Sequence, residues 1–212
     1  MPTLAIDTTA EFGSIALGDE EILLHAPDGF SGLLFGQIEA MLARQRVKLS
    51  DIDLFAAASG PGSFTGVRIG LAAVKGLGEV LGKPVAAVSN LQALAEFGEG
   101  DLRATVIDAR RGEVYAALFD RAGRQVIPES VLKFPHLLKL LGDREFEWVS
   151  TNFDPFRAAL VGTRFEHHRV VTAPRALAKA IARIAERRPP ADAAVIEANY
   201  VRRPDAEIFW KE

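Results

Sequence analysis

Two short segments of the sequence end an apolar run with an aspartate, and both could hold a nucleotide. Leu4-Ala5-Ile6 leads into Asp7-Thr8-Thr9, and residues 104–107 lead into Asp108. A carboxylate at a strand end can hold Mg²⁺ through water, while the N–H groups of the turn bind a phosphate. The same residue types also cap turns in purely structural roles, so that alternative stays open. The second segment suits phosphate less, because Ala109-Arg110-Arg111 stands where the first has hydroxyls.

A glycine-rich loop, Gly60-Pro61-Gly62-Ser63-Phe64-Thr65-Gly66, joins an apolar run to a segment with helical spacing. Backbone amides and the dipole at a helix N-terminus favour an anion. The loop is not a P-loop, because the spacing differs and no lysine follows the last glycine. Ser63 and Thr65 could cap the helix or bind a ligand, so a structural turn and an anion or partner site both stay open. Phe64 is unusual in so tight a loop, and Arg68 opposes the helix dipole, which predicts an anionic partner for it.

Histidines and glycines indicate no metal site and an incomplete nucleotide site. No two of the four histidines stand at i and i+4, and His167 and His168 would point to opposite faces of a strand. Neither cysteine nor a Gly-x-Ser-x-Gly motif is present, so we expect no catalytic residue and no metal ligand in this chain. A kinase-type cleft needs glycines in its second half. After Gly112 this sequence has three, at separate positions.

Two predicted helices in the first half carry more apolar or small residues than a single core face requires. Leu34, Ile38 and Met41 recur at helical spacing after Ser31, a predicted N-cap, and residues 70–78 are rich in glycine and alanine. Core packing would explain the pattern, and so would a helix-on-helix interface with a second chain. The predicted interface residues are Leu34, Ile38, Leu71, Ala72, Lys75 and Gly76.

The elements that must position these residues form a pattern that occurs twice. Three strands, a helix, a strand and a helix are predicted up to about Leu81, followed by a strand at residues 84–88 and a short helix at residues 90–97. The apolar-apolar-Asp strand end and its hairpin return from residue 104. This favours an α/β chain of two mixed-sheet lobes with helices. We expect an N-terminal lobe (1–100), a C-terminal lobe (101–190) with a helix over 174–187 capped by Thr172, and a tail (191–212) that packs back on the lobes.

Composition agrees with a globular chain. Of 212 residues, 49% are hydrophobic and 25% charged, which excludes disorder, and the absence of cysteine excludes a disulfide scaffold. We find no apolar run of about 18 residues and no signal peptide, so we expect a cytoplasmic protein without a membrane span. Residues 1–100 carry 6 basic and 12 acidic residues, whereas residues 101–212 carry 19 and 16. Neither half is basic enough for a dedicated nucleic-acid binder.

Several segments of the sequence resemble those of a known family. The block Gly-Pro-Gly-Ser-Phe-Thr-Gly-Val-Arg-Ile-Gly at residues 60–70 is similar to the signature of the TsaB family, also called YeaZ. The other matching segments follow in order along the whole chain: residues 4–8, Val88-Ser89, Leu91, Leu94-Ala95, residues 107–110 and 112–115, Tyr200-Val201-Arg202 and Trp210-Lys211.

The resemblance implies a two-lobed actin-like ATPase (ribonuclease H-like) fold in a cytoplasmic protein with no catalytic activity of its own. It implies a partner subunit that scaffolds the catalytic subunit TsaD, with the small ATPase TsaE, for threonylcarbamoyl transfer to the adenosine next to the tRNA anticodon. The family pairs with TsaD through the N-lobe helices and forms a homodimer when alone. The chain would then meet tRNA only through the complex and have no intrinsic cofactor. ATP or ADP with Mg²⁺, if bound, would lie at a shared interface.

Three alternatives stay open. The chain could be an independent Mg²⁺-dependent ATPase or kinase that uses Asp7 and Asp108. A peptidase has little support, because no metal site or triad signature is found. The C-terminal lobe could contact tRNA directly through arginines, although exposed arginines are usually just solvated; these are Arg110, Arg111, Arg121, Arg124, Arg187, Arg188, Arg202 and Arg203.

Overall fold

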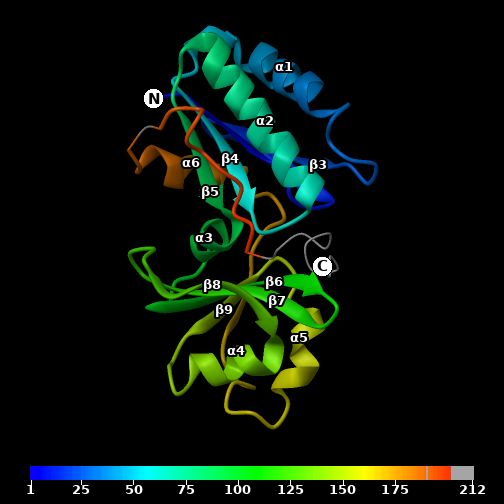
Figure 1. The fold of residues 1–212 in the computed structure, drawn as a ribbon, viewed down its shortest axis with the longest axis vertical. Helices are drawn as coiled ribbons and strands as arrows, with labels where there is room; N and C mark the ends of the chain where they lie inside the picture. The colour runs from blue at the N-terminus through cyan, green and yellow to red at the C-terminus, as the bar shows by residue number, and fades with distance from the viewer. Residues whose placement is uncertain (190, 202–212) are drawn as a thin grey trace, which may run out of the picture. The chain divides into compact units, whose positions relative to one another are not determined.

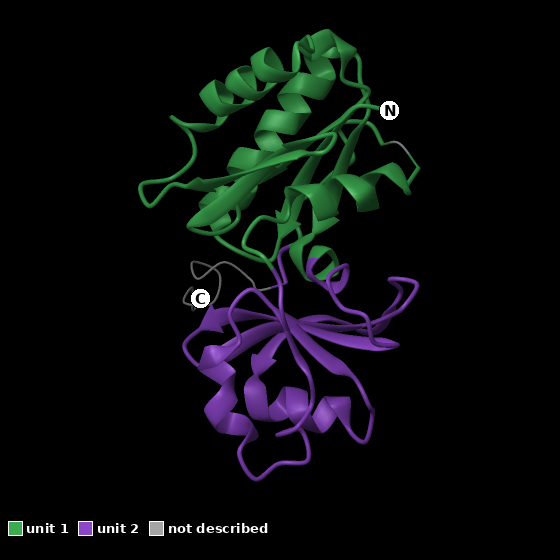
Figure 2. Ribbon diagram, turned by 180° about the vertical axis from the view of Figure 1, so that it is seen from behind, with its two compact units in different colours: residues 1–93, 174–199 green, residues 94–173, 200–212 purple. Residues whose placement is uncertain are grey.

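The chain folds into two compact units, each built on its own five-stranded sheet. The structure is a computed structural model that describes residues 1–189 and 191–201. Unit 1 contains Met1–Ala93 and Pro174–Asn199, and unit 2 contains Leu94–Ala173 together with Tyr200 and Val201 (Figure 2). The expected boundary between lobes near residue 100 therefore moves to residue 93. The expectation that residues 174–190 belong to the C-terminal lobe was wrong, because the helix in this segment buries its apolar side on unit 1.

The sheet of unit 1 has the strand order β3-β2-β1-β4-β5. Strand β1 pairs with β2 in antiparallel and with β4 in parallel orientation, and β5 extends the parallel side. The strand bounds are β1 Thr3–Asp7, β2 Phe12–Leu17, β3 Glu20–His25, β4 Leu54–Gly60 and β5 Val85–Ser89.

The sheet of unit 2 repeats this topology. Its order, β10-β9-β6-β7-β8, becomes the order of unit 1 when β6 to β10 are matched with β1 to β5. This confirms the expected duplication of mixed-sheet lobes. The sequence did not predict β8, whose side chains are mostly half-buried or exposed, or β10, which has three residues. The bounds are β6 Leu102–Arg110, β7 Glu113–Asp120, β8 Gln125–Lys133, β9 Glu147–Ser150 and β10 Val170–Thr172.

The helices of unit 1 cover both faces of its sheet (Figure 1). Helices α1 (Leu34–Gln45) and α2 (Phe64–Leu81) share a core with alternate side chains of β1 and β4, such as Leu4, Ile6 and Phe55. Helix α6 (Ala178–Glu186) contacts β1, β2, β4 and β5 on the other face. That face presents buried alanines, and small side chains let a helix approach closely; they are Ala5, Ala16, Ala56, Ala58 and Ala86.

The remaining helices are short. They are α3 Asn90–Ala95, α4 Phe134–Leu141 and α5 Asp154–Arg157, with 3₁₀ turns at Leu49–Asp51 and Ala158–Leu160. In unit 2, α4 and α5 add Phe134 and Phe156 to an aromatic core around Trp148, which is fully buried. No helix within residues 1–189 and 191–201 is both long and apolar enough to span a membrane.

Two expected helix caps were wrong. Ser31 does not cap α1, which begins at Leu34 after Leu33, because the glycines before it disfavour an earlier helical turn. Thr172 does not cap α6, because it belongs to β10 and pairs with Ser150. Helix α6 instead has its first amides satisfied by side chains of the sheet.

The C-terminal tail follows unit 1 as far as Asn199. The Val85 amide donates to the Ala191 carbonyl at 2.9 Å, Ile196 is buried in the core of unit 1, and the Asn199 amide donates to the Ser59 carbonyl at 2.8 Å. Residues 202–212, which include Arg202, Arg203, Trp210 and Lys211 of the sequence predictions, lie outside the described residues.

Candidate functional site

The first candidate site, Asp7-Thr8-Thr9, is a buried turn whose polar groups bond to one another. Asp7 Oδ1 accepts hydrogen bonds from the Thr9 amide at 3.0 Å and from Thr9 Oγ1 at 2.7 Å. The three residues are at most 4% exposed. Burial raises the pKa of Asp7, while the hydrogen bonds from Thr9 and Asn90 act in the opposite direction. The turn is thus held by its own carboxylate, as the structural alternative in the sequence analysis describes.

Asn90, which the sequence analysis missed, joins this turn to the end of β4. Its Nδ2 donates to Thr9 Oγ1 at 2.8 Å and lies 3.4 Å from both carboxylate oxygens of Asp7. Its Oδ1 accepts from the Gly60 amide at 3.1 Å. The available signal was an asparagine at the end of an apolar strand, where carboxyl ends of parallel strands meet.

The glycines of the signature loop allow α2 to lie against the Asp7–Thr9 turn. A Cβ atom at Gly66 would overlap the Thr8 carbonyl oxygen, and one at Gly62 would overlap the backbone of Thr9. The close approach is fixed by two hydrogen bonds, Thr8 Oγ1 to the Gly66 carbonyl at 2.7 Å and the Ser63 amide to the Thr9 carbonyl at 2.6 Å. Gly62 and Gly66 are therefore required for packing within the chain, independently of any ligand.

Of the other loop residues, Ser63 caps α2 and Phe64 is exposed to solvent. Ser63 is the N-cap of α2, because its hydroxyl accepts from the Gly66 amide at 3.3 Å. Phe64 is 43% exposed, and the guanidinium carbon of Arg68 lies 3.8 Å from the centre of its ring. Arg68, for which the sequence predicts an anionic partner, therefore stacks on an aromatic face in a cation–π contact.

A cavity of about 460 Å³ lies between this turn, the start of α2 and the segment that precedes α1. Its size is in the range of small-molecule sites. Glu11 is the one ionisable residue among the described residues that line it, and Glu11 Oε1 lies 2.8 Å from His25 Nε2. The negative charge of Glu11 would repel a phosphate group, which the N-terminus of α2 would otherwise attract. Thr8, Ser63 and Thr65 provide its hydroxyl groups.

Asp108 makes the same kind of side-chain contact in unit 2, but it does not end its strand as the sequence predicted, because β6 continues to Arg110 and pairs there with Glu113. Asp108 Oδ1 accepts from the Arg110 amide at 2.8 Å, as Asp7 accepts from Thr9 in unit 1. The structure thus brings Asp7, Thr8 and Thr9 together in unit 1 and places Asp108, half-buried, in unit 2.

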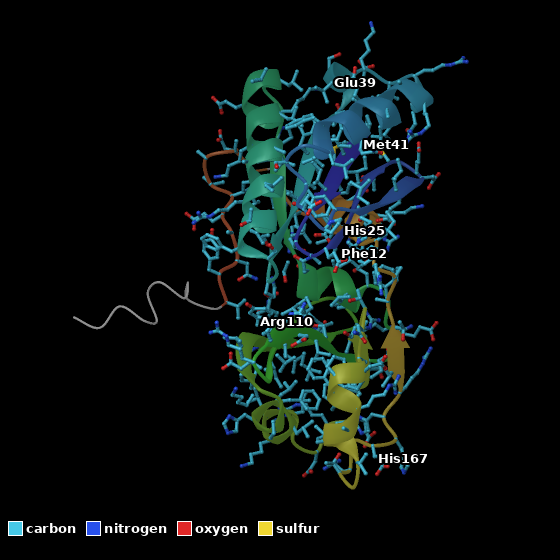
Figure 3. All side chains as sticks on the ribbon, turned by 90° about the vertical axis from the view of Figure 1, so that its right-hand side faces the viewer. Phe12, His25, Glu39, Met41, Arg110 and His167 are labelled. Atoms are coloured by element: carbon cyan, nitrogen blue, oxygen red, sulfur yellow. The ribbon has the colours of Figure 1, made fainter. Side chains whose placement is uncertain are left out.

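The histidines occupy separate environments. His25 stacks on Phe12, with ring centres 4.5 Å apart (Figure 3), and His168 packs edge-on against Phe146 and Phe165. His136 and His167 are exposed. Within residues 1–189 and 191–201, no group of three or more His, Cys, Asp or Glu side chains could hold a metal ion.

Half of the predicted interface residues are in the core. Leu34, Ile38 and Leu71 are at most 6% exposed and pack against the sheet, so their assignment to an interface was wrong. The i, i+4 spacing that singled out Leu34 and Ile38 marks the core face of α1. Ala72 and Gly76 are exposed on α2, and Lys75 is half-buried.

The exposed side of α1 and α2 also carries apolar residues outside the predicted interface set. Phe35 is 55% exposed and Val80 is 84% exposed. Around Gly32, Gly36 and Gly76, a Cβ atom would meet no other atom within 4 Å, so packing inside the chain does not require glycine there. We call this surface the α1–α2 face; it comprises Gly32, Phe35, Gly36, Ala72, Gly76 and Val80.

Comparisons with known proteins agree with this geometry. The family described as "TsaD: tRNA N6-adenosine threonylcarbamoyltransferase" matches residues 28–149. The "tRNA threonylcarbamoyladenosine biosynthesis protein TsaB" of Bacillus subtilis (strain 168) is 28% identical, over 100% of this chain and 99% of that protein. The protein of the same name from Escherichia coli (strain K12) is 34% identical, over 71% of this chain and 70% of that one.

Solved structures extend the similarity to the fold. "YeaZ from Pseudomonas aeruginosa" has a TM-score of 0.75 and 26% identity, over 94% of this chain and 99% of that one. A second Pseudomonas aeruginosa structure, described as "an uncharacterized protein with similarity to peptidase YEAZ", has a TM-score of 0.78 and 27% identity, over 95% and 99%. The expected two-lobed actin-like (ribonuclease H-like) α/β fold is thereby confirmed.

Proposed function

The chain belongs to the TsaB (YeaZ) family, and on that basis we propose that it is a non-catalytic partner subunit in tRNA threonylcarbamoyladenosine biosynthesis. In this proposal it binds and scaffolds a TsaD-like catalytic subunit, which transfers the threonylcarbamoyl group to the adenosine next to the tRNA anticodon. A TsaE-like ATPase completes the complex, and the free chain forms a homodimer. The reaction is cytoplasmic, and ATP or ADP with Mg²⁺, if bound, lies at a shared interface.

The α1–α2 face is the observation that carries this proposal. Phe35 in α1 and Val80 in α2 are exposed, and Gly36 and Gly76 on the same two helices leave open space where a side chain would stand. Small residues let a second helix approach the backbone, and the exposed apolar side chains then supply buried area. A chain that acted alone would gain helix stability by replacing Gly36 and Gly76, because glycine costs about 1 kcal/mol in a helix interior.

The turn around Asp7 supports a binding role more than turnover by this chain. The carboxylate is surrounded by Thr9 and Asn90, and α2 packs directly on the turn through Gly66. A catalytic Mg²⁺ would need water around the carboxylate, and here hydrogen bonds from the chain occupy that space.

Co-elution with a TsaD-like subunit tests the proposal. Size-exclusion chromatography with light scattering should give a one-to-one species for the wild-type chain, and threonylcarbamoyl transfer to tRNA should then require both chains. Val80→Glu places a charge on the α1–α2 face, and Gly76→Leu fills the space that a partner helix would use. Both variants should lose the one-to-one species.

A matched control distinguishes an effect of the α1–α2 face from a general effect of adding a surface charge. Val161→Glu makes the same change at a position in unit 2 that is 70% exposed, and it should bind as the wild type does. Equal binding by all three variants would overturn the assignment of the interface. A wild-type chain that neither binds the catalytic subunit nor supports modification would overturn the function itself.

A further inference from the structure

The β6–β7 hairpin of unit 2 occupies the place that the Asp7–Thr9 turn occupies in unit 1, but its surroundings differ. In unit 1, β4 and β5 are joined through α2, 18 residues long, which packs on the turn through Gly62 and Gly66. In unit 2, the equivalent connection between β9 and β10 contains α5, four residues long, and a 3₁₀ turn. The hairpin tip of unit 2 is exposed at Arg110 and Arg111, whereas Thr8 and Thr9 are buried.

The backbone of this tip is one that arginine rarely adopts. Arg110 pairs with Glu113, so Arg111 and Gly112 form a two-residue loop. The φ angles are 65° at Arg110, 53° at Arg111 and 69° at Gly112. Such a loop favours Asn-Gly or Gly-Gly, because side chains other than Asn and Asp are strained at positive φ. Two arginines kept in strained positions at an exposed tip are typical of a functional site.

A third cation comes to the same tip from the neighbouring strand. Lys133, at the end of β8, donates from Nζ to the Arg111 carbonyl at 2.7 Å. Two acidic residues of the described chain lie at this tip: Asp108, whose Oδ2 is 3.9 Å from Arg110 Nη1, and Glu113, which is opposite Lys133 in the strand register. The Arg110 side chain is 87% exposed. The 3.9 Å between Arg110 and Asp108 is longer than the contacts of Arg124, Arg157 and Arg169 in the same unit, which each hold a carboxylate at 3.0 Å or less.

We propose that Arg110, Arg111 and Lys133, the hairpin cluster, bind phosphodiester groups of an RNA, and that this chain therefore contacts the tRNA substrate directly. The proposal rests on the proposed function. Guanidinium groups bind phosphate oxygens through two parallel N–H bonds, and lysine adds a point charge. A free nucleotide has phosphate too, but three solvent-facing cations at a hairpin tip suit the outside of a polymer that presents several phosphates in a row.

The salt dependence of binding to labelled tRNA measures how much the hairpin cluster contributes to tRNA affinity. We would titrate the complex with its TsaD-like subunit, and the chain alone, by fluorescence anisotropy at several KCl concentrations. The test variant is Arg110→Asn/Arg111→Asn, because asparagine tolerates positive φ and the turn should keep its shape. The control is Arg121→Asn/Arg124→Asn, which removes two arginines that are 76% and 82% exposed at the opposite end of β7.

We expect the test variant to bind tRNA more weakly by roughly tenfold or more at low salt, since it loses two phosphate contacts. The slope of log K against log salt should fall by about 1.4 to 1.8, at 0.7 to 0.9 per phosphate contact. Lys133→Gln should lower it by about half that amount, and the control should retain the wild-type slope.

Three outcomes would overturn the proposal. One is equal loss of affinity in the test and control variants, which would indicate non-specific attraction. Another is an unchanged slope in the test variant. The third is a variant that loses binding of ATP but keeps tRNA affinity, which would identify a free nucleotide as the ligand. Co-elution of the wild-type chain with the catalytic subunit is scored separately, so failure of the proposed function is distinguishable from failure of this contact.

Discussion

The hydroxyl of Ser14, in β2, accepts hydrogen bonds from the backbone amide of Ala178 at 2.9 Å and from the neighbouring amide of Leu177 at 3.0 Å. Glu21 accepts the next amide, that of Lys179, at 2.9 Å. Side chains of the β2–β3 hairpin therefore cap α6, although Ser14 and Ala178 are 164 positions apart in the sequence. This contact explains why the segment after residue 173 returns to unit 1.

Replacing Ser14 tests this long-range cap. Ser14→Ala leaves two amides without their acceptor in a buried place, so the free energy of unfolding should fall by about 1–2 kcal/mol in urea denaturation. Ser50→Ala, at an exposed serine, is the control and should change it by less than about 0.5 kcal/mol. Equal effects of the two changes would contradict a capping role for Ser14.

Two glycines of α2 should respond in opposite ways to the same substitution. Gly66→Ala forces a Cβ atom onto the Thr8 carbonyl, which should lower the free energy of unfolding by about 1–3 kcal/mol or more. Gly76→Ala meets open space and should raise the free energy of unfolding by about 0.5–1 kcal/mol. Thermal and urea denaturation of both variants would check the difference. A destabilising Gly76→Ala would show that this position is packed within the chain.

The buried carboxylate of Asp7 should make stability depend on pH. Burial raises its pKa in the folded state, so the folded chain holds this proton more tightly than the unfolded chain does. The contribution of Asp7 to stability is therefore greatest at low pH. It should fall as the pH rises from the ordinary aspartate pKa near 3.8 through the raised value.

Asp7→Asn supplies the comparison, because asparagine cannot titrate. The free energy of unfolding of the wild type minus that of the variant should decrease with increasing pH in this window and level off above it. Urea denaturation between pH 4 and 8 measures it. A difference that grows with pH would mean that the hydrogen bonds from Thr9 and Asn90 outweigh burial.

Glu147 should stabilise the start of unit 2. Its buried carboxylate accepts hydrogen bonds from the amides of Glu99 and Gly100, the latter at 2.7 Å, and Arg169 lies 3.5 Å away. Glu147→Ala removes the acceptor for two amides and should cost about 2–4 kcal/mol. Glu147→Gln keeps an acceptor oxygen and should cost less. The fluorescence of Trp148 in urea would report both; equal losses would assign the effect to the charge.

The sequence by itself determined the strands, helices and turns that depend on local pattern. Apolar runs ending in Asp7 and Asp108 predicted two equivalent strands, and the strand orders agree, although β6 continues past Asp108 to Arg110. Hydrophobic spacing gave α2 with its end at Leu81, and the block at residues 60–70 indicated the family. These features are readable because backbone periodicity and turn chemistry act between residues close along the chain.

Only the tertiary structure decided which faces and ends these elements present. Leu34 and Phe35 are neighbours in sequence, yet one is in the core and the other is exposed, because a helix turns about 100° per residue and the sheet selects one side. Asn90 reaches Asp7, and Ser14 caps α6, through contacts that no local pattern encodes. Gly66 and Gly76 look alike in the sequence, and the carbonyl of Thr8 beside one of them makes the difference.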